Sequence, residues 1–441
     1  MTRRGSGVRI PYGPPRNARN PQATGLGIRR SPPGGTEVAR VRHAAATLHV
    51  LRWPVAWRDV SRRTLFLCAL ALGSLFAAAS ASASSAGLLP PIGPGPGAER
   101  SSDVLAYASG SDRDTLYNMG SNGRYDAVSL SISGAYRPIT GPGNDYDGDG
   151  YDDILWYAPG GAADSIWYGG PNGFTDQEVS ISGDYLPVTG PGWDVDGDDI
   201  TDVFWYAPGS TPDYLWQGRA DRDFTSTKLP VSGDYQPIPG NFDGDAFGDI
   251  LWYRPGSGAD FLWRGRANGT FASEQTRISG VYRPIAPMAP DLTGDGITDI
   301  LWYAPGGAAD ALWPYRADGS HGDRSTSITG TYTPLAGDFD GDGRSDVFWY
   351  APGTASDYVW YFDASGAHAQ RSPTVNGDYL PQVSGSAGFD RDGTADILWY
   401  RPGSAADFRW NGTAGRGFSS SSLDLDGLYL PLIGAYRNDP S

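Results

Sequence analysis

The sequence is poor in the residues that most often carry out catalysis. Its 441 residues include one cysteine, Cys68, and four histidines, of which only His321 and His368 lie beyond residue 86. One thiol cannot build a disulfide framework, and both of these histidines lie in polar, turn-like segments. The sequence contains no nucleophile elbow, zinc-binding histidine pair or phosphate-binding loop. We therefore expect a protein that is not an enzyme.

Positive charge is scarce over most of the chain. The first 86 residues hold 13 of the 34 lysines and arginines but only 2 of the 50 aspartates and glutamates. The rest carries 21 basic and 48 acidic side chains, a net charge of 21 − 48 = −27. Such a surface repels nucleic acid, so we expect no DNA or RNA partner. It suits calcium, because the bound ions cancel part of the charge.

The chain has one long apolar run, from Leu65 to Ala79. At about 15 residues it is short for a membrane span, which needs about 20. Arg62-Arg63 precede it and a small-residue cleavage site ends at Ala83, which together predict a signal peptide over residues 60–86. Leu67, before Cys68, is too large for the usual lipoprotein cleavage site. We expect export by a Sec or twin-arginine route, and a secreted, extracellular protein that does not span the membrane after cleavage.

Residues 1–59 precede the segment at which a signal peptide should begin. We expect a start codon assigned too far upstream, so that translation begins at Val60; the alternative is a disordered extension rich in proline and arginine. Residues 87–101 are interpreted as a linker, and residues 102–437 as the folded domain.

One segment recurs seven times between residues 103 and 436. Its first landmark, the tyrosine that ends a short apolar strand, repeats every 47 to 50 residues, at Tyr107, Tyr157, Tyr206, Tyr253, Tyr303, Tyr350 and Tyr400. Its second landmark, Tyr-x-Pro, begins at Tyr136, Tyr185, Tyr235, Tyr282, Tyr332, Tyr379 and Tyr429. A third landmark is aromatic, at Tyr117, Trp167, Trp216, Trp263, Trp313, Trp360 and Trp410. This recurrence indicates a repeat architecture.

Each repeat contains four short aromatic and β-branched segments separated by glycine, proline and aspartate, which predicts four strands. The sequence therefore predicts an all-β fold, a seven-bladed β-propeller of four-stranded antiparallel blades. Asp103-Val-Leu-Ala-Tyr107 matches the second strand of a repeat and Tyr429 to Gly434 matches the first. Pairing of these N- and C-terminal strands closes the ring and hides both sheet edges. A solenoid or two smaller propellers are the alternatives.

Six repeats contain an acidic segment between the first two strands. We call these segments acid loops 1 to 6 and number their positions 1 to 9. Carboxylates at positions 1, 3, 5 and 9 with a backbone carbonyl at position 7 match the oxygen ligands of calcium, and glycine at position 6 permits the bend. The candidate ligands are Asp145, Asp147, Asp149, Tyr151 and Asp153 in loop 1; Asp194, Asp196, Asp198, Ile200 and Asp202 in loop 2; Asn241, Asp243, Asp245, Phe247 and Asp249 in loop 3; Asp291, Thr293, Asp295, Ile297 and Asp299 in loop 4; Asp338, Asp340, Asp342, Arg344 and Asp346 in loop 5; and Asp390, Asp392, Thr394 and Asp396 in loop 6, which begins with Gly388.

Metal-free hairpin turns are the alternative, because aspartate and glycine favour turns anyway. However, carboxylates this close repel one another, and six uncompensated clusters are hard to reconcile with a stable fold. We therefore expect several structural calcium ions. The loops contain no neighbouring base or nucleophile, so the ions are expected to brace the fold.

The order of an aspartate-rich loop followed by Asp153-Ile-Leu-Trp-Tyr-Ala-Pro159-Gly160 resembles the FG-GAP repeats of integrin α-chain heads, and looks closest to bacterial FG-GAP-like or VCBS-type repeat proteins. Trp-Tyr replaces the small residues before Ala-Pro, and only the Tyr-x-Pro segment represents the Phe-Gly half. The resemblance covers residues 103–436. It implies a seven-bladed propeller with calcium in the hairpin loops, and it does not imply integrin function.

A binding or adhesion module for a protein or cell-surface partner is the function that we expect, in a monomeric protein. The alternative is a carbohydrate-binding lectin that stacks sugars on Trp167, Trp216, Trp263, Trp313, Trp360 and Trp410, although these rings equally suit packing between blades. After the Trp-Tyr step, Arg254 and Arg401 replace the alanine of the other repeats, which favours a local site. A polysaccharide-active enzyme is less favoured because the acids recur in nearly every blade, whereas an active site is singular.

Overall fold

A computed structural model describes residues 100–438, except 111–112, 122, 161–162, 210–211, 257, 286–289 and 308. The expected upstream extension, the signal peptide and most of the linker lie outside these residues. Within the described part, no helix is long and apolar enough to cross a membrane.

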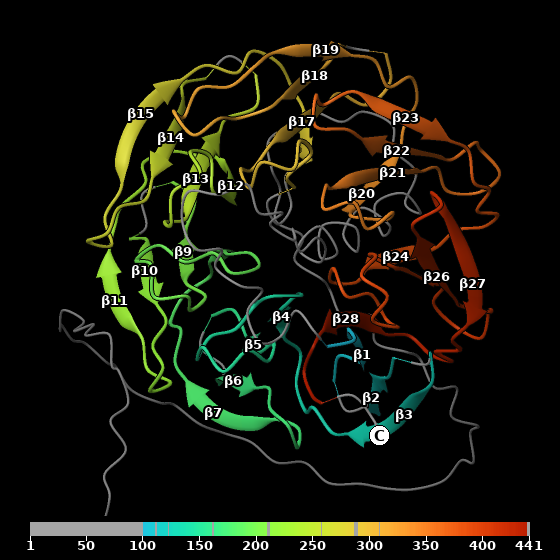
Figure 1. The fold of residues 1–441 in the computed structure, drawn as a ribbon. Coiled ribbons are helices and arrows are strands. Elements are labelled where there is room, and N and C mark those ends of the chain that lie inside the picture. Colours follow the sequence, from blue (N-terminus) through green and yellow to red (C-terminus); the bar gives the residue numbers. More distant parts are fainter. Residues whose placement is uncertain are drawn as a thin grey trace, which may run out of the picture. The chain divides into compact units, whose positions relative to one another are not determined.

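Seven four-stranded antiparallel sheets follow one another around a ring (Figure 1). We number the blades in chain order from the first that is continuous. Blade 1 has β4 (Arg137–Ile139), β5 (Ile154–Tyr157), β6 (Asp164–Tyr168) and β7 (Thr175–Val179). Blade 2 has β8 (Leu186–Val188), β9 (Val203–Tyr206), β10 (Tyr214–Gln217) and β11 (Thr225–Lys228). Blade 3 has β12 (Gln236–Gly240), β13 (Asp249–Tyr253), β14 (Asp260–Arg264) and β15 (Ala272–Thr276).

The remaining sheets complete the ring. Blade 4 has β16 (Arg283–Ile285), β17 (Ile300–Tyr303), β18 (Asp310–Trp313) and β19 (Arg324–Thr326). Blade 5 has β20 (Thr333–Gly337), β21 (Asp346–Tyr350), β22 (Tyr358–Phe362) and β23 (His368–Arg371). Blade 6 has β24 (Leu380–Val383), β25 (Ile397–Tyr400), β26 (Phe408–Thr413) and β27 (Gly417–Ser422). Blade 7 combines β28 (Leu430–Gly434) with β1 (Asp103–Tyr107), β2 (Asp114–Met119) and β3 (Tyr125–Leu130).

The predicted closure is confirmed. β28 pairs with β1 antiparallel over five residues, with Asp103 opposite Gly434 and Tyr107 opposite Leu430. The last strand of the chain thus supplies the first strand of blade 7, and β1, which lies between β28 and β2, is not left as a free edge.

Tryptophan and tyrosine of the second strands hold neighbouring blades together. Alternation along β5 places Ile154 and Trp156 against blade 7, and Tyr157 against blade 2. The tyrosine of each blade contacts the tryptophan of the next with ring centroids 5.0 to 5.2 Å apart, in the pairs Tyr107–Trp156, Tyr157–Trp205, Tyr206–Trp252, Tyr253–Trp302, Tyr303–Trp349 and Tyr350–Trp399. Blade 7 has Ala106 in place of tryptophan, so its interface with blade 6 lacks this pair.

A buried aspartate braces the hairpin that follows each second strand. In blade 2, Asp213 Oδ1 accepts a hydrogen bond from the Ala207 amide at 2.6 Å, and Oδ2 accepts one from the Val231 amide at 2.7 Å. The same two bonds recur at Asp114, Asp164, Asp260, Asp310, Asp357 and Asp407. The landmark tyrosine adds a third link, since the Tyr206 hydroxyl accepts from the Tyr235 amide and donates to the Gly233 carbonyl. These seven aspartates are therefore structural.

Candidate metal centre

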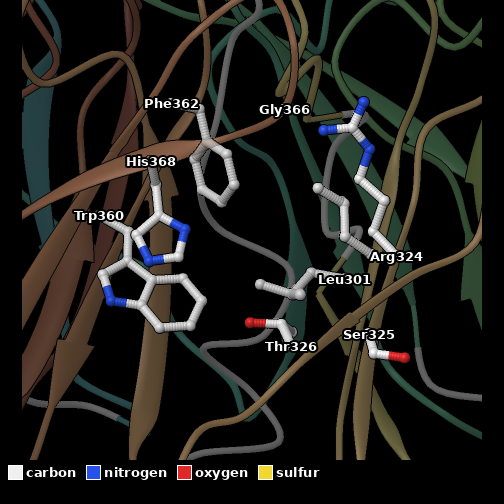
Figure 2. Close-up of a pocket in the computed structure, with 9 residues that line it drawn as sticks. Leu301, Arg324, Ser325, Thr326, Trp360, Phe362, Gly366 and His368 are labelled. Carbon is white, nitrogen blue, oxygen red and sulfur yellow. The ribbon is translucent and has the colours of Figure 1, made fainter.

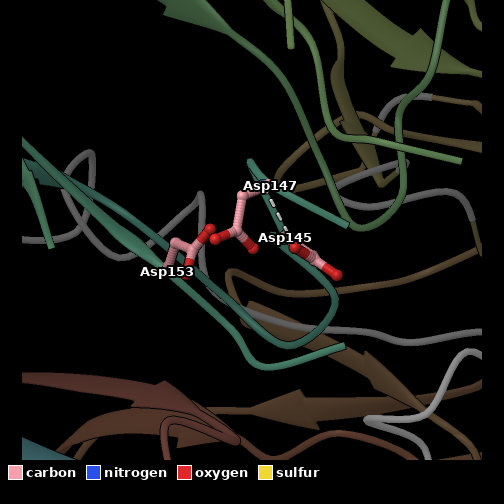
Figure 3. Close-up of side chains that lie close together, drawn as sticks. All are labelled: Asp145, Asp147 and Asp153. Atoms are coloured by element: carbon pink, nitrogen blue, oxygen red, sulfur yellow. Dashed lines mark hydrogen bonds between the residues drawn. The ribbon is translucent and has the colours of Figure 1, made fainter. Parts of the chain in front are cut away.

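Four of the six acid loops gather three carboxylates. One oxygen from each member lies within 4.8 Å of the others in Asp145, Asp147 and Asp153 of loop 1; Asp194, Asp196 and Asp202 of loop 2; Asp338, Asp340 and Asp346 of loop 5; and Asp390, Asp392 and Asp396 of loop 6. Figure 3 shows the three side chains of loop 1 turned toward one another. An all-oxygen set of this kind suits a hard cation such as calcium.

Backbone amides hold the position-1 carboxylate in place. In loop 1, Asp145 Oδ1 accepts hydrogen bonds from the Asp147 and Gly148 amides, and Oδ2 accepts one from the Gly150 amide at 2.6 Å. Gly150 has a φ of 83°, which glycine adopts without strain. Loop 2 has Asp199 at this position, and it adopts a φ of 64°. The loop therefore keeps its shape even where the predicted glycine is missing.

Loop 6 departs from the pattern at position 1 for a steric reason. Gly388 has a φ of 72°, and a Cβ there would lie 2.7 Å from Asp396 Oδ2. The Thr394 carbonyl oxygen, at 2.6 Å, and the Asp396 side chain thus occupy the space that a side chain at Gly388 would need.

The position-9 aspartates are buried and link each loop to the third strand of its own blade. Asp153 Oδ2 accepts from the Tyr146 amide at 2.6 Å, and Oδ1 accepts from the Gly169 amide at 2.7 Å. Burial, followed by repulsion from nearby carboxylates, raises the pKa of Asp153 well above its usual value. The same causes raise the pKa of Asp202 to about 8 and that of Asp346 to about 9. Without a cation, the Asp202 and Asp346 carboxyls, with pKa values of about 8 and 9, therefore favour the protonated form at neutral pH.

The position-3 carboxylates have partners that lie far away in sequence. In loop 1, the Arg222 guanidinium donates from Nε to Asp147 Oδ2 at 2.6 Å, and in loop 5 Arg416 Nε donates to Asp340 Oδ2 at 2.7 Å. In loop 2, the Gln217 amide donates to Asp196 Oδ2 at 2.8 Å, and Asn411 contacts Asp390 Oδ2 of loop 6 in the same way.

Neighbouring loops are also joined by their backbones. The amide at position 8 of one loop donates to the position-1 carbonyl of the preceding loop, as Thr201 does to Asp145 at 2.7 Å and Ala395 to Asp338 at 2.6 Å. The series is complete around the ring, with Gly248 to Asp194, Thr298 to Asn241, Ser345 to Asp291, Ser102 to Gly388 and Asp152 to Ala435. The loops therefore form one continuous hydrogen-bonded circle.

Loops 3 and 4 do not bring three carboxylates within 4.8 Å of one another. In loop 3, the Asn241 amide donates to the Asp245 carbonyl, and Arg264 Nε lies 3.7 Å from Asp243 Oδ2. A resident guanidinium thus supplies positive charge beside this loop. Loop 4 has Thr293 at position 3, and its buried hydroxyl has no hydrogen-bond partner among the described residues.

The position-5 and position-7 candidates have local roles in the loops. The position-5 aspartates of loops 1, 2 and 5 accept a hydrogen bond from the position-7 amide, at 3.0 Å from Tyr151 to Asp149. The side chain at position 7 packs on the position-4 glycine of the preceding loop, so that a Cβ at Gly148 would lie 3.0 Å from Ile200. Only in loop 6 does the position-5 aspartate, Asp392, belong to the gathered set.

One further observation indicates that the loops suit calcium. In loop 2, Asp196 Oδ1 is buried and has no hydrogen-bond partner within the described part of the chain. Burial and the neighbouring Asp198 and Asp194 raise the pKa of this carboxyl to about 6. A buried carboxylate oxygen without a donor is costly, and a cation in the loop would satisfy it.

The tryptophans considered for sugar stacking are packed within the blades. Each lies edge-on to the tryptophan of the neighbouring second strand, with centroids 5.1 to 5.4 Å apart. His368 stacks on Trp360 at 3.9 Å and His321 stacks on Trp313 at the same distance, where other blades use phenylalanine. Figure 2 shows His368, Trp360 and Arg324 around a cavity of about 140 Å³ between blades 4 and 5. This volume is below the usual 300 Å³ or more of a small-molecule site.

The two arginines considered as a local site do not come together. Arg254 follows β13 of blade 3 and Arg401 follows β25 of blade 6. Both are exposed, but two blades separate them along the shorter way around the ring. They therefore do not form one site.

Comparison with known proteins supports the repeat assignment. The FG-GAP repeat matches residues 139–174, and the FG-GAP-like repeat matches residues 241–302 and 291–349. No curated protein sequence matches the chain.

Several solved structures align with the chain at low identity. A protein from Lactobacillus plantarum is 9% identical with a TM-score of 0.49, over 76% of this chain and 99% of that one. The Tc holotoxin pore of Photorhabdus luminescens is 14% identical with a TM-score of 0.36, over 72% and 16%. The rhamnogalacturonan lyase YesW is 11% identical with a TM-score of 0.32, over 75% and 65%. Three segments of the chain thus match FG-GAP or FG-GAP-like repeats, and the ring of seven blades is consistent with a repeat protein of the FG-GAP type.

Proposed function

We propose that this protein is a secreted, calcium-braced β-propeller that acts as a non-enzymatic binding module. The observation that carries the calcium part is the gathering of three carboxylates in four separate loops at equivalent positions of the fold. A single acidic turn would carry little weight, but four clusters with the same backbone support are best explained by one ligand chemistry. The predicted signal peptide at residues 60–86 supports export to a compartment where calcium is abundant.

Calcium is proposed for loops 1, 2, 5 and 6. Positions 1, 3 and 9 would hold the ion in loops 1, 2 and 5, and positions 3, 5 and 9 would hold it in loop 6. When bound, the ion would neutralise the cluster and fix the hairpin between the first two strands. Because the loops contact one another around the ring, this brace would act on all the blades.

The test is to measure the metal content and stability of the purified protein. Each ion stabilises the fold by about 2.7 kcal/mol when its concentration is 100 times the dissociation constant. We expect elemental analysis to find about four calcium ions per chain, and a strong chelator to lower the melting temperature by several degrees. An unchanged melting temperature together with no bound calcium would refute the proposal.

The partner is proposed to be a protein or a cell surface. The recurrence of the acidic clusters in separate blades argues for a structural use, and the packed tryptophans leave little aromatic surface for sugars. The exposed large hydrophobic residues in the described part are few, at Tyr125, Val281 and Leu428. A glycan array separates this proposal from the lectin alternative, because saturable sugar binding would favour a lectin.

A further inference from the structure

Two segments that join the third and fourth strands each hold the position-3 carboxylates of two neighbouring acid loops. We call them the β10–β11 and β26–β27 turns, and we include in each the last residues of the third strand. In the β10–β11 turn of blade 2, Gln217 donates to Asp196 of loop 2, and Arg222, five residues later, donates to Asp147 of loop 1 in the preceding blade. The β26–β27 turn of blade 6 repeats this arrangement. There Asn411 contacts Asp390 of loop 6 and Arg416 donates to Asp340 of loop 5.

The two arginines occupy a backbone conformation that other blades give to glycine. Arg222 has a φ of 64° and Arg416 a φ of 61°, whereas the equivalent residues elsewhere are Gly123, Gly173, Gly269, Gly319 and Gly366. A left-handed conformation is strained for a residue that carries a side chain. Among the seven described turns between third and fourth strands, only these two carry this strain, which indicates that the arginine side chains make a contact needed there.

Each arginine is supported by an aromatic ring from the blade that it reaches. The Arg222 guanidinium lies over Tyr168 at 4.5 Å and the Arg416 guanidinium lies over Tyr361 at 5.4 Å. Tyr168 and Tyr361 follow the strand-three tryptophan, at the position that Gln217 and Asn411 occupy in their own blades. The position-3 carboxylate is therefore held by a residue of the same blade in loops 2 and 6, and by an arginine of the next blade in loops 1 and 5. Each of the two turns holds one loop of each kind.

The pairs served by these turns coincide with the loops that gather carboxylates. Loops 1 and 2 form one pair, and loops 5 and 6 form the other. Loop 4, with Thr293 at position 3, has Pro314 and Gly366 at the two supporting positions, neither of which offers a donor side chain. Support is thus present where position 3 is a carboxylate and absent where it is not.

We propose that the β10–β11 and β26–β27 turns couple calcium binding within two pairs of loops, so that an ion in one loop raises the affinity of its neighbour. This inference rests on the proposed calcium function. An ion that fixes Asp196 would also fix Gln217 and the turn, which places Arg222 on Asp147. One Asp147 oxygen is then held by the arginine, and the other stays directed to the ion. The second ion would therefore meet a loop that is already ordered.

The test is a calorimetric calcium titration of the chelator-treated full-length protein. We expect four ions with a Hill coefficient above 1, the second ion of each pair binding about fivefold more tightly than the first or better. Arg222→Gln should abolish cooperativity in one pair, and Arg222→Gln with Arg416→Gln should give a Hill coefficient of 1. Arg219→Gln is the matched control, because Arg219 lies in the same turn and pairs only with Asp221 in the described contacts; it should behave as the wild type.

Two results would overturn the coupling. If the wild type bound four ions independently, the coupling would be refuted but the calcium function would not. The same holds if the double arginine variant kept full cooperativity. Binding of no calcium would refute both. Far-ultraviolet circular dichroism and the melting temperature in saturating calcium show whether each variant is folded, and the wild-type isotherm tests the inference without any variant.

Discussion

The seven buried aspartates that brace hairpins and the aspartates of the acid loops should respond differently to mutation. Asp213, one of the bracing aspartates, tests this difference. Asp213 is fully buried and accepts hydrogen bonds from the Ala207 and Val231 amides. The change Asp213→Ala leaves both amides without an acceptor. An unsatisfied buried donor costs about 1–3 kcal/mol, so the free energy of unfolding should fall by about 2–6 kcal/mol.

The expected shift can be measured by calorimetry in saturating calcium. The unfolding entropy is about 2.1 cal/mol/K per residue, or about 0.7 kcal/mol/K for a domain of about 340 residues. The melting temperature of Asp213→Ala should therefore fall by about 3–8 °C. Calcium stoichiometry should stay at the wild-type value, because Asp213 braces the hairpin that follows β9, whereas acid loop 2 precedes this strand.

The exposed Asp234 provides the matched control. Asp234→Ala removes a carboxylate of the same blade and should shift the free energy of unfolding by less than about 0.5 kcal/mol. If Asp213→Ala were as stable as Asp234→Ala, or if it lost a calcium ion, then the division between bracing and ligand aspartates would be wrong.

Three further predictions concern the loops and the closure. First, the raised pKa values of Asp202, about 8, and Asp346, about 9, mean that these folded carboxyls keep protons that the unfolded chain loses near pH 4; the calcium-free protein should therefore lose stability as pH rises from 5 to 8. Since bound calcium displaces these protons, its affinity should rise over the same range, by up to about tenfold per pH unit for each proton released, and titrations at pH 6, 7 and 8 that gave one constant would contradict this. Second, Asn241→Asp restores the position-1 carboxylate of loop 3 and should let this loop take an additional ion, seen as an increase of one in the calcium content; an unchanged content would show that the missing carboxylate is not what distinguishes this loop. Third, deletion of residues 430–438 removes β28 and exposes β1, so the truncated protein should self-associate in size-exclusion chromatography, and a stable monomer would count against the closure.

The sequence was sufficient to predict the blades because each blade repeats the same constraints. The Trp-Tyr step alternates between two apolar faces, as Trp156 and Tyr157 do, and only packing on both neighbours accounts for that pattern. The closing strand followed from matching Leu430–Gly434 to the first strand of a repeat. The blades and their closure could therefore be predicted without any structure.

The contacts that hold the position-3 carboxylates could not be predicted from the sequence in this way. Arg222 lies 75 residues from Asp147, so no local pattern joins them, and Gln217 and Arg222 carry a signal only when they are aligned with Asn411 and Arg416. The role of Asp213 was equally hidden, because a buried bracing aspartate and a calcium ligand look alike in a sequence. What distinguishes them in the structure is that the loop aspartates lie beside other carboxylates, whereas Asp213 belongs to no such group in the described part of the chain.

The pairing of β28 with β1 has a consequence for how the protein is made. Blade 7 needs residues from both ends of the domain, so six blades can fold while the chain is still being synthesised, but the seventh cannot. Until Leu430–Gly434 emerges, β1 presents an unpaired edge. Closure of the ring therefore cannot precede the synthesis of the last strand, and until then the β1 edge is open to association with other molecules.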